Sequence, residues 1–168
     1  HIVLNKNLKL EKVKKIHLEY SDNDSRENDI KILKKNEKNL YNIIGSKFNA
    51  NNLIENLLSD ESNDLKIFDK NFYFDIMIDQ VFLDKEYTVN DLNGNFSFKK
   101  NEIVNAELYG NFSKKEKLKF TIKSNESEKV TTLFLDLAEP IVKRYEFIKG
   151  YRGGSLDFYS SKKLDKSF

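Results

Sequence analysis

Carboxylates are abundant in this chain, and a close pair of them could perform general acid–base chemistry. Asp75 and Asp79 lie on the same side of an alternating stretch, yet four residues of extended chain separate them by roughly 13 Å. Glycoside hydrolysis needs two carboxyl groups about 5 Å apart, or less than about 10 Å apart in the inverting mechanism. Both side chains also fall on the polar side of the stretch, so we expect solvated surface carboxylates there.

A run of acidic and amide residues, Asp22-Asn23-Asp24, is similar to the start of a calcium-binding loop. Such a loop requires an oxygen ligand at its fifth position, Gly at the sixth and Glu at the twelfth. The chain has Arg26, Glu27 and Leu33 at those three places. We therefore expect an ordinary loop without a metal.

The other residue types that commonly carry catalysis are scarce or badly placed. The chain has no Cys and only two histidines, His1 and His17, so neither a thiolate nucleophile nor a zinc cluster is available. No nucleophile elbow, phosphate-binding loop or dinucleotide fingerprint is present. The one glycine-rich spot, Arg152-Gly153-Gly154, precedes an extended stretch, and we predict a structural turn there. We expect a non-enzymatic chain with no catalytic residue, no metal and no cofactor.

Composition narrows the choice of partners. Among 168 residues, 29 Lys and Arg nearly balance 27 Asp and Glu, for a net charge of +2, and the lysines are spread along the chain. This is not the basic patch typical of a nucleic-acid partner. No stretch approaches the roughly 18 apolar residues of a membrane span. Because the chain begins at His1 and has a single Met, we expect a piece of a longer protein.

Alternation of apolar and polar residues dominates the chain from residue 70 onward, and this is the period of a strand with one apolar face. It runs through residues 71–83, 89–100, 103–112, 118–123 and 130–137. The breaks between them are short and polar, which is typical of consecutive antiparallel neighbours. We predict a mainly β fold, with a minor α+β character, built on an antiparallel meander sheet that is curved or groove-like. Its expected apolar face comprises Phe72, Phe74, Ile76, Ile78, Phe82, Leu92, Phe96, Phe98, Val104, Ala106, Leu108, Phe112, Leu118, Phe120 and Ile122.

The N-terminal part is less regular. Even-numbered apolar residues predict a strand over residues 8–20, followed by a polar loop over 22–29 and two further strands over 30–34 and 40–48. The period then changes to that of a helix over about 50–59, where Asn49 is placed to cap the first turn.

A second helix is predicted over about 138–148, with Pro140 near its first turn and Gly150 just after its end. A closing strand over 155–160 follows. We expect one structural unit made of N-terminal strands and a loop (1–48), a short helix and linker (49–64), a meander with its helix and closing strand (65–160), and a flexible tail (161–168).

The apolar stripe has two interpretations. It could be the inner face of an ordinary β core, or the wall of a one-sided sheet that holds acyl chains. Alternation alone cannot separate them, because both need the same pattern. Five half-apolar strands with only two short helices to cover them favour the second interpretation.

The order of elements in the C-terminal half resembles a known family. An alternating strand, Phe72-Tyr73-Phe74-Asp75-Ile76-Met77-Ile78-Asp79, is followed by Leu92-Asn93-Gly94-Asn95-Phe96 and Ile103-Val104-Asn105-Ala106-Glu107-Leu108-Tyr109-Gly110. Then Leu135-Asp136-Leu137-Ala138-Glu139-Pro140 opens a helix, and Tyr151-Arg152-Gly153-Gly154-Ser155-Leu156-Asp157-Phe158 starts a strand. This arrangement is similar to the AsmA-like envelope proteins, particularly the YhdP branch. Residues 47–54 fit the same scheme more loosely.

The resemblance implies a large protein anchored in the inner membrane of a Gram-negative envelope, with a long periplasmic β-groove. The family is associated with phospholipid transport and outer-membrane maintenance, so acyl chains would be the partner, and the membrane would be reached through parts outside this chain. The family places Arg152, Gly153 and Gly154 in a structural turn and supplies no catalytic residues to carry over. This chain is richer in Lys and Asn than the family.

The alternative is an all-β structural or protein-interaction module whose apolar face is packed internally. In either case, free sheet edges could pair between copies.

Overall fold

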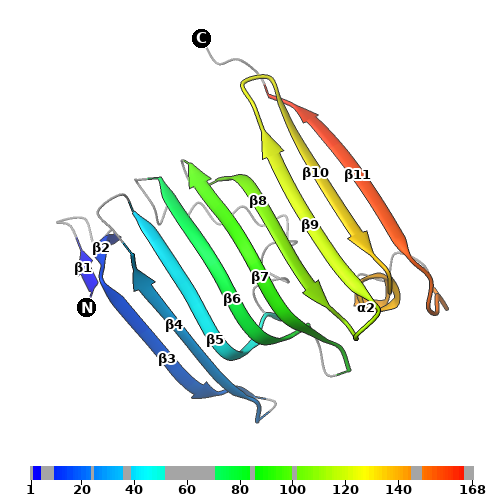
Figure 1. Cartoon of the computed structure of the whole chain (residues 1–168), viewed down its shortest axis with the longest axis horizontal. Helices are drawn as coiled ribbons and strands as arrows, with labels where there is room; N and C mark the ends of the chain where they lie inside the picture. The colour runs from blue at the N-terminus through cyan, green and yellow to red at the C-terminus, as the bar shows by residue number, and fades with distance from the viewer. Residues whose placement is uncertain are drawn as a thin grey trace.

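The computed structural model describes residues 2–4, 10–23, 25–35, 39–51, 71–83, 86–99, 102–144 and 149–164. This part of the chain is mainly β, as predicted, and forms one open nine-stranded sheet in the order β11-β10-β9-β8-β7-β6-β5-β4-β3, with a separate β1-β2 pair (Figure 1). The strands are β1 (Ile2–Leu4), β2 (Leu10–Val13), β3 (Lys15–Ser21), β4 (Glu27–Lys34), β5 (Leu40–Asn49), β6 (Phe72–Phe82), β7 (Thr88–Lys99), β8 (Glu102–Asn111), β9 (Lys117–Ser124), β10 (Glu128–Leu135) and β11 (Leu156–Lys163).

The predicted meander is confirmed from β6 to β10, where each strand pairs antiparallel with the next. Short polar turns make this possible. In the β9–β10 turn, Asn125 Oδ1 accepts hydrogen bonds from the backbone N–H groups of Ser127 and Glu128, at 2.9 and 2.8 Å. An Asn side chain that bonds to the backbone a few residues ahead is a common way to hold a tight turn.

One pair of neighbours departs from the antiparallel rule. β5 runs parallel to β6, with Tyr41 opposite Phe74 and Ile43 opposite Ile76. A parallel pair cannot be joined by a hairpin and needs a long crossover, which here spans the residues between β5 and β6. The helix predicted over 50–59 falls in this crossover, and from residue 52 onward it lies outside the described residues.

The N-terminal strands differ from the prediction in two places. The expected strand over 8–20 is interrupted at Lys14, so that β2 pairs with β1 while β3 joins the large sheet. The expected loop over 22–29 is shorter than predicted, because β4 already begins at Glu27, opposite Ser21. Asp22 closes this hairpin by accepting a 3.0 Å hydrogen bond from the backbone N–H of Arg26.

The C-terminal prediction also needs a correction. Residues 161–163, expected in a flexible tail, extend β11 because they pair with residues 128–130 of β10. The second predicted helix is present as α2 (Glu139–Arg144), and its expected continuation to 148 lies outside the described residues. Pro140 stands in its first turn, where the missing N–H costs no hydrogen bond.

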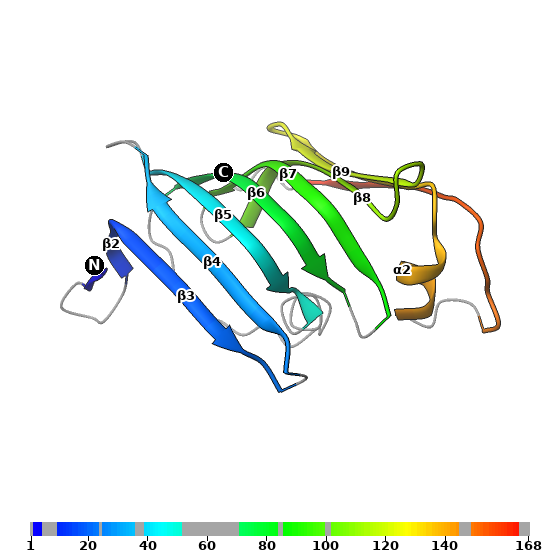
Figure 2. The same cartoon turned by 60° about the horizontal axis from the view of Figure 1, so that its bottom comes forward.

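The sheet is strongly twisted, and α2 lies on one of its faces, near one end (Figure 2). Ala138 and Val142 are buried, and Ile141 packs against the core of the sheet. Of the helices, α2 is the one whose bounds fall within the described part of the chain. The side of the sheet that faces α2 is the apolar one.

Candidate apolar binding face

Cross-strand register brings the alternating apolar residues of successive strands together on one side of the sheet. Phe72 lies opposite Phe98, and Phe74 opposite Phe96. Further along, Leu108 lies opposite Phe120. We call this side the apolar face, and it is made by the following side chains: Ile16, Leu18, Ile30, Ile32, Tyr41, Ile43, Phe48, Ala50, Phe72, Phe74, Ile76, Ile78, Val81, Leu83, Val89, Leu92, Phe96, Phe98, Ala106, Leu108, Phe112, Leu118, Phe120, Ile122, Leu133, Leu135, Leu156 and Phe158.

Two of the residues predicted for this face need comment. Phe82 lies on the opposite side, because its neighbours Val81 and Leu83 belong to the buried core, and successive strand residues alternate. The Phe82 ring is instead covered by the Arg26 guanidinium, 4.8 Å from its centroid. Val104 is half-buried and stands where the β7–β8 pairing is irregular, between Ile103 and Asn105. The prediction for Phe82 is therefore wrong.

The misplaced Phe82 has a structural cause that involves three strands. Ser46, Asp79 and Asp91 are aligned with one another across β5, β6 and β7 but are not paired. At the same level the register shifts against the flanking strands β4 and β8. Asp91 has a φ of 53°, which is unusual for a residue other than glycine. Each residue that is not paired shifts the alternation by one, so that the apolar face continues with residues of the other parity.

The sequence carries a signal for this change of face, which a strict period of two does not take into account. In β6 the apolar step from Ile78 to Val81 is three residues, and in β7 the step from Val89 to Leu92 is also three. A strict period of two instead places Phe82 on the apolar face and leaves Val81 and Val89 off it. Both valines are almost completely buried, at 4% and 2% exposure.

Five aromatic rings form a cluster at the end of the apolar face that lies away from α2. They are contributed by Tyr41, Phe72, Phe74, Phe96 and Phe98. The Phe74 and Phe96 rings stack with centroids 4.8 Å apart, and Phe96 meets Phe98 edge-on at 5.4 Å. Both arrangements are favourable aromatic geometries that add to simple area burial.

The end of the apolar face near α2 is aliphatic and tightly packed. Ile78, Val81 and Val89 are buried there, and Ile141 of α2 packs against them. At this end, α2 and the sheet form an ordinary two-layer core.

Between these ends, a transverse row of apolar side chains crosses the C-terminal half of the sheet. Leu108, Phe120, Leu133 and Phe158 are successive cross-strand partners on β8, β9, β10 and β11. The first three are half-buried, and Phe158 is 46% exposed. Leu108 and Phe120 are among the residues predicted for the apolar face. Leu133 and Phe158 are not, because the alternation in β10 and β11 was not assigned to a face.

The chain bends at Gly153, within the predicted structural turn at Arg152, Gly153 and Gly154. Gly153 and Gly154 have φ values of 63° and 71°, a region that suits glycine. The N–H of Gly153 donates a 2.7 Å hydrogen bond to Glu139 Oε2, and the N–H of Ala138 donates to the carbonyl of Gly154. The turn therefore ties the start of α2 to the approach to β11.

The Glu139 carboxylate is the most strongly perturbed titratable group that the structure describes. Lys143 Nζ lies 2.7 Å away, one helical turn later, and this bond, together with the N–H of Gly153 and the Tyr87 hydroxyl, lowers the pKa of Glu139 to about 2. The same contacts with Glu139 and Tyr87 raise the pKa of Lys143. The charges complement the helix, with the acid in its first turn.

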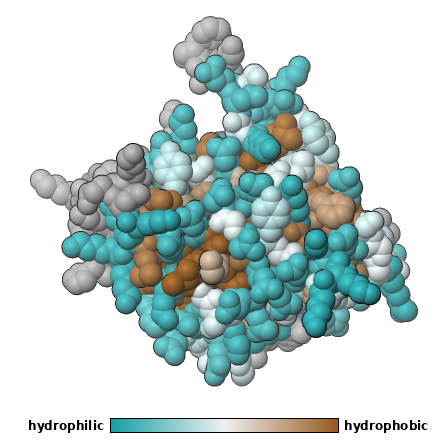
Figure 3. All heavy atoms as spheres, viewed as in Figure 1, coloured by the Kyte–Doolittle hydropathy of each residue, from teal (hydrophilic) through white to brown (hydrophobic). Residues whose placement is uncertain are grey.

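The face turned away from α2 is mainly hydrophilic, with separate small hydrophobic patches (Figure 3). Tyr73, Met77 and Tyr159 are exposed there. A hollow of about 700 Å³ lies at one end of the sheet, where it is lined by the start of β6, the end of β7, the start of β8 and the β9–β10 turn.

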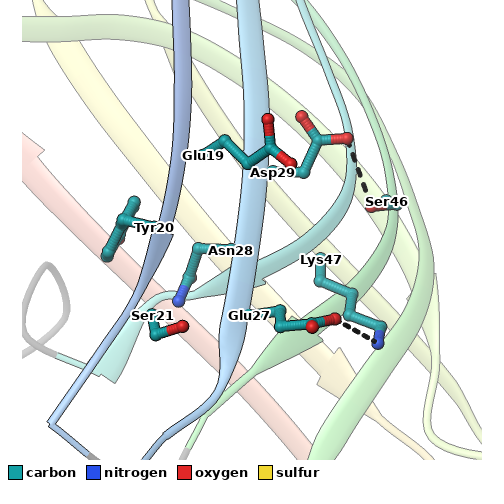
Figure 4. A pocket seen from close by; sticks show the side chains of 8 residues that line it. All are labelled: Glu19, Tyr20, Ser21, Glu27, Asn28, Asp29, Ser46 and Lys47. Atoms are coloured by element: carbon teal, nitrogen blue, oxygen red, sulfur yellow. Dashed lines mark hydrogen bonds and ion pairs between the residues drawn. The ribbon is translucent and has the colours of Figure 1, made fainter.

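A second hollow, of about 430 Å³, is lined by residues of β3, β4 and β5 (Figure 4). Asp29 stands in it and bonds His17 Nε2 at 2.8 Å and the Ser46 hydroxyl at 3.4 Å. The bond from His17 is the main cause that lowers the pKa of Asp29. These contacts occupy the carboxylate in holding three neighbouring strands together.

Two of the candidate chemical groups, Asp75 and Asp22, have structural partners within the described residues. Asp75, one of the two carboxylates considered for catalysis, pairs with Lys35 at 3.3 Å. Asp22 accepts hydrogen bonds from the Asn28 and Asn49 side chains. The described part of the chain contains no group of three or more metal-ligating side chains and no helix long and apolar enough to cross a membrane.

No protein-family model matches the chain, and no curated protein or solved structure matches it either. The interpretation of the apolar face therefore rests on its own geometry.

Proposed function

We propose that the chain is a segment of an AsmA-like envelope protein and holds phospholipid acyl chains on its apolar face. The observation that supports this proposal is the continuity of the face, which extends from Ile16 on β3 to Phe158 on β11 while α2 covers only one end. In the envelope, such a segment would lie on the periplasmic side of the inner membrane and contribute to phospholipid transport or outer-membrane maintenance.

The physics of this role requires no bond to be broken. Transfer of apolar surface out of water is favourable by about 25 cal/mol per Å². The transverse row of apolar side chains on β8, β9, β10 and β11 offers such surface to an acyl chain. The head group would remain in water beyond the sheet. A mainly hydrophilic opposite face, as in Figure 3, keeps the segment soluble while one side binds lipid.

Two adjacent residues of β10 give a matched test, because they point to opposite faces. Leu133 belongs to the half-exposed row, whereas Phe134 is opposite Lys119 and is 42% exposed on the hydrophilic face. With delipidated protein and a fluorescent phospholipid, we expect saturable binding that Leu133→Asp weakens at least tenfold. We expect Phe134→Asp to leave binding unchanged. Circular dichroism and thermal unfolding would show that both variants fold.

A second candidate function is an all-β interaction module that packs its apolar face internally. The burial of Ile78, Val81 and Val89 to 4% exposure or less favours it. Absence of lipid binding by the folded wild-type chain would contradict the lipid proposal and support this module. Equal loss of binding in both β10 variants would show that any binding does not use the apolar face.

A further inference from the structure

Strand β11 is the last strand of the sheet, and its outer edge has no neighbour among the described strands (Figure 1). Seven of its eight residues are exposed. An exposed strand edge presents a row of unpaired backbone donors and acceptors that can pair with another strand. This edge can therefore accept a tenth strand.

The pairing with β10 fixes which backbone groups are available on that edge. The N–H of Leu164 donates to the carbonyl of Ser127 at 2.8 Å, which continues the β10–β11 register by one position. In an antiparallel pair, inward and outward backbone groups alternate along the strand. The groups of the even-numbered residues therefore point to β10, and those of Asp157, Tyr159, Ser161 and Lys163 point outward.

From this placement we propose that β11 pairs antiparallel with β11 of a second copy, around a two-fold axis at Ser160. This register sets Asp157 opposite Lys163 and Tyr159 opposite Ser161, twice each by symmetry. The outward backbone groups of both strands then meet one another. Leu156 lies opposite Leu164 on the apolar face, so that the two apolar faces become one continuous surface.

Opposite charges favour the register centred at Ser160 over registers shifted along the strand. Asp157 and Lys163 make no ion pair within the described part of the chain, and they stand near opposite ends of the same strand. Centred at Ser160, the dimer gains two cross-strand Asp–Lys pairs, which are favourable when they are directly opposite. A shift that centres the dimer at Tyr159 would pair Asp157 with Ser161 and leave Lys163 without an acid.

The opposite edge of the sheet is a poorer partner for β11. An antiparallel pairing of β11 with β3 that sets Ser21 opposite Asp157 would place Lys15 opposite Lys163. A shift by two residues would place Glu19 opposite Asp157. Like charges directly opposite one another are destabilising. The self-complementary two-fold contact is also the usual way in which identical chains form closed dimers.

Sedimentation equilibrium of the whole chain over a range of concentrations tests this pairing. We expect a reversible shift from a mass of 19.8 kDa to twice that value. Asp157→Lys should weaken the dimer at least tenfold, because it sets two lysines opposite one another. Lys163→Asp should do the same, and the double variant Asp157→Lys/Lys163→Asp should restore the dimer.

Tyr159→Pro is a backbone test of the same edge. The N–H of residue 159 points away from β10, and proline is tolerated at an edge position whose N–H faces solvent. The variant should therefore fold, as judged by circular dichroism, but remain monomeric. A wild-type chain that stays monomeric at all concentrations would overturn the proposal, as would a charge-swapped double variant that fails to recover association. Neither result bears on lipid binding, which the β10 variants Leu133→Asp and Phe134→Asp test separately.

Discussion

At the scale of single residues, Glu139 joins the start of α2 to the turn before β11. Its carboxylate accepts hydrogen bonds from Lys143 and from the N–H of Gly153. These donors favour the ionised form, so the folded chain holds the pKa of Glu139 at about 2, below its ordinary value of 4.5. A group with a lowered folded pKa contributes stability above its unfolded pKa and loses it as the pH falls through the folded one.

We therefore predict that the wild-type chain loses unfolding free energy between about pH 4.5 and pH 2 more steeply than Glu139→Gln. Urea unfolding across this range measures the difference. At neutral pH the variant should be the less stable of the two, and the curves should converge at low pH. Parallel curves would show that Glu139 titrates alike in the folded and unfolded states.

At the scale of elements, the residues of β5, β6 and β7 that are not paired in the register decide which side chains reach the core. Val81 is buried although it stands three residues after Ile78. The extra residue between them, Asp79, is exposed. With Asp79 as an extra, unpaired residue, Ile78 and Val81 of β6 both reach the buried face of the sheet.

Val81→Ala is therefore expected to lower the free energy of unfolding by about 2 kcal/mol, through lost burial and the cavity that remains. Asp79→Ala should change it by less than about 0.5 kcal/mol, as is usual for surface substitutions. Chemical denaturation of both variants makes the comparison. A cost of less than about 0.5 kcal/mol for Val81→Ala would mean that the strand alternates without interruption, because Val81 would then face away from the core.

The same elements show what the sequence could and could not predict. Alternation predicted the meander, because each of the strands from β6 to β10 buries one face against a neighbour that is close in sequence. It could not predict the parallel pairing of β5 with β6, since the same alternation fits either direction. Nor did a fixed period of two capture the steps from Ile78 to Val81 and from Val89 to Leu92, where cross-strand pairing overrides local periodicity.

The candidate site was predictable to the same extent. The apolar residues of β6–β9 lie together, apart from Phe82 on the other face and Val104 at an irregular pair. The packing among them was not predictable, because the Phe74–Phe96 stack depends on the register between two strands. Sequence types alone give no register, so the aromatic cluster and the half-exposed row emerged only from the structure.

At the scale of the whole molecule, the sheet has well-packed central strands and two weakly packed edge strands. β6 and β7 have neighbours on both sides and contribute Phe72, Ile78, Val81 and Val89 to the buried core. By contrast, β3 and β11 are edge strands with mostly exposed side chains. Local opening free energies range from near zero at weakly packed margins to the global value in the core. An open sheet of this kind should therefore open from its edges inward.

Amide hydrogen exchange measured residue by residue, at a concentration where the chain is monomeric, tests this order. We expect the slowest exchange in β6 and β7 and an alternation within β11. The amides of Phe158, Ser160 and Lys162 donate to β10 and should be protected, whereas those of Tyr159 and Ser161 face solvent and should exchange rapidly. Raising the protein concentration should protect the second group only if β11 pairs between copies. Uniform protection along monomeric β11 would mean that its outer edge is already covered within one chain, which would remove the basis for both edge pairing and an open margin of the apolar face.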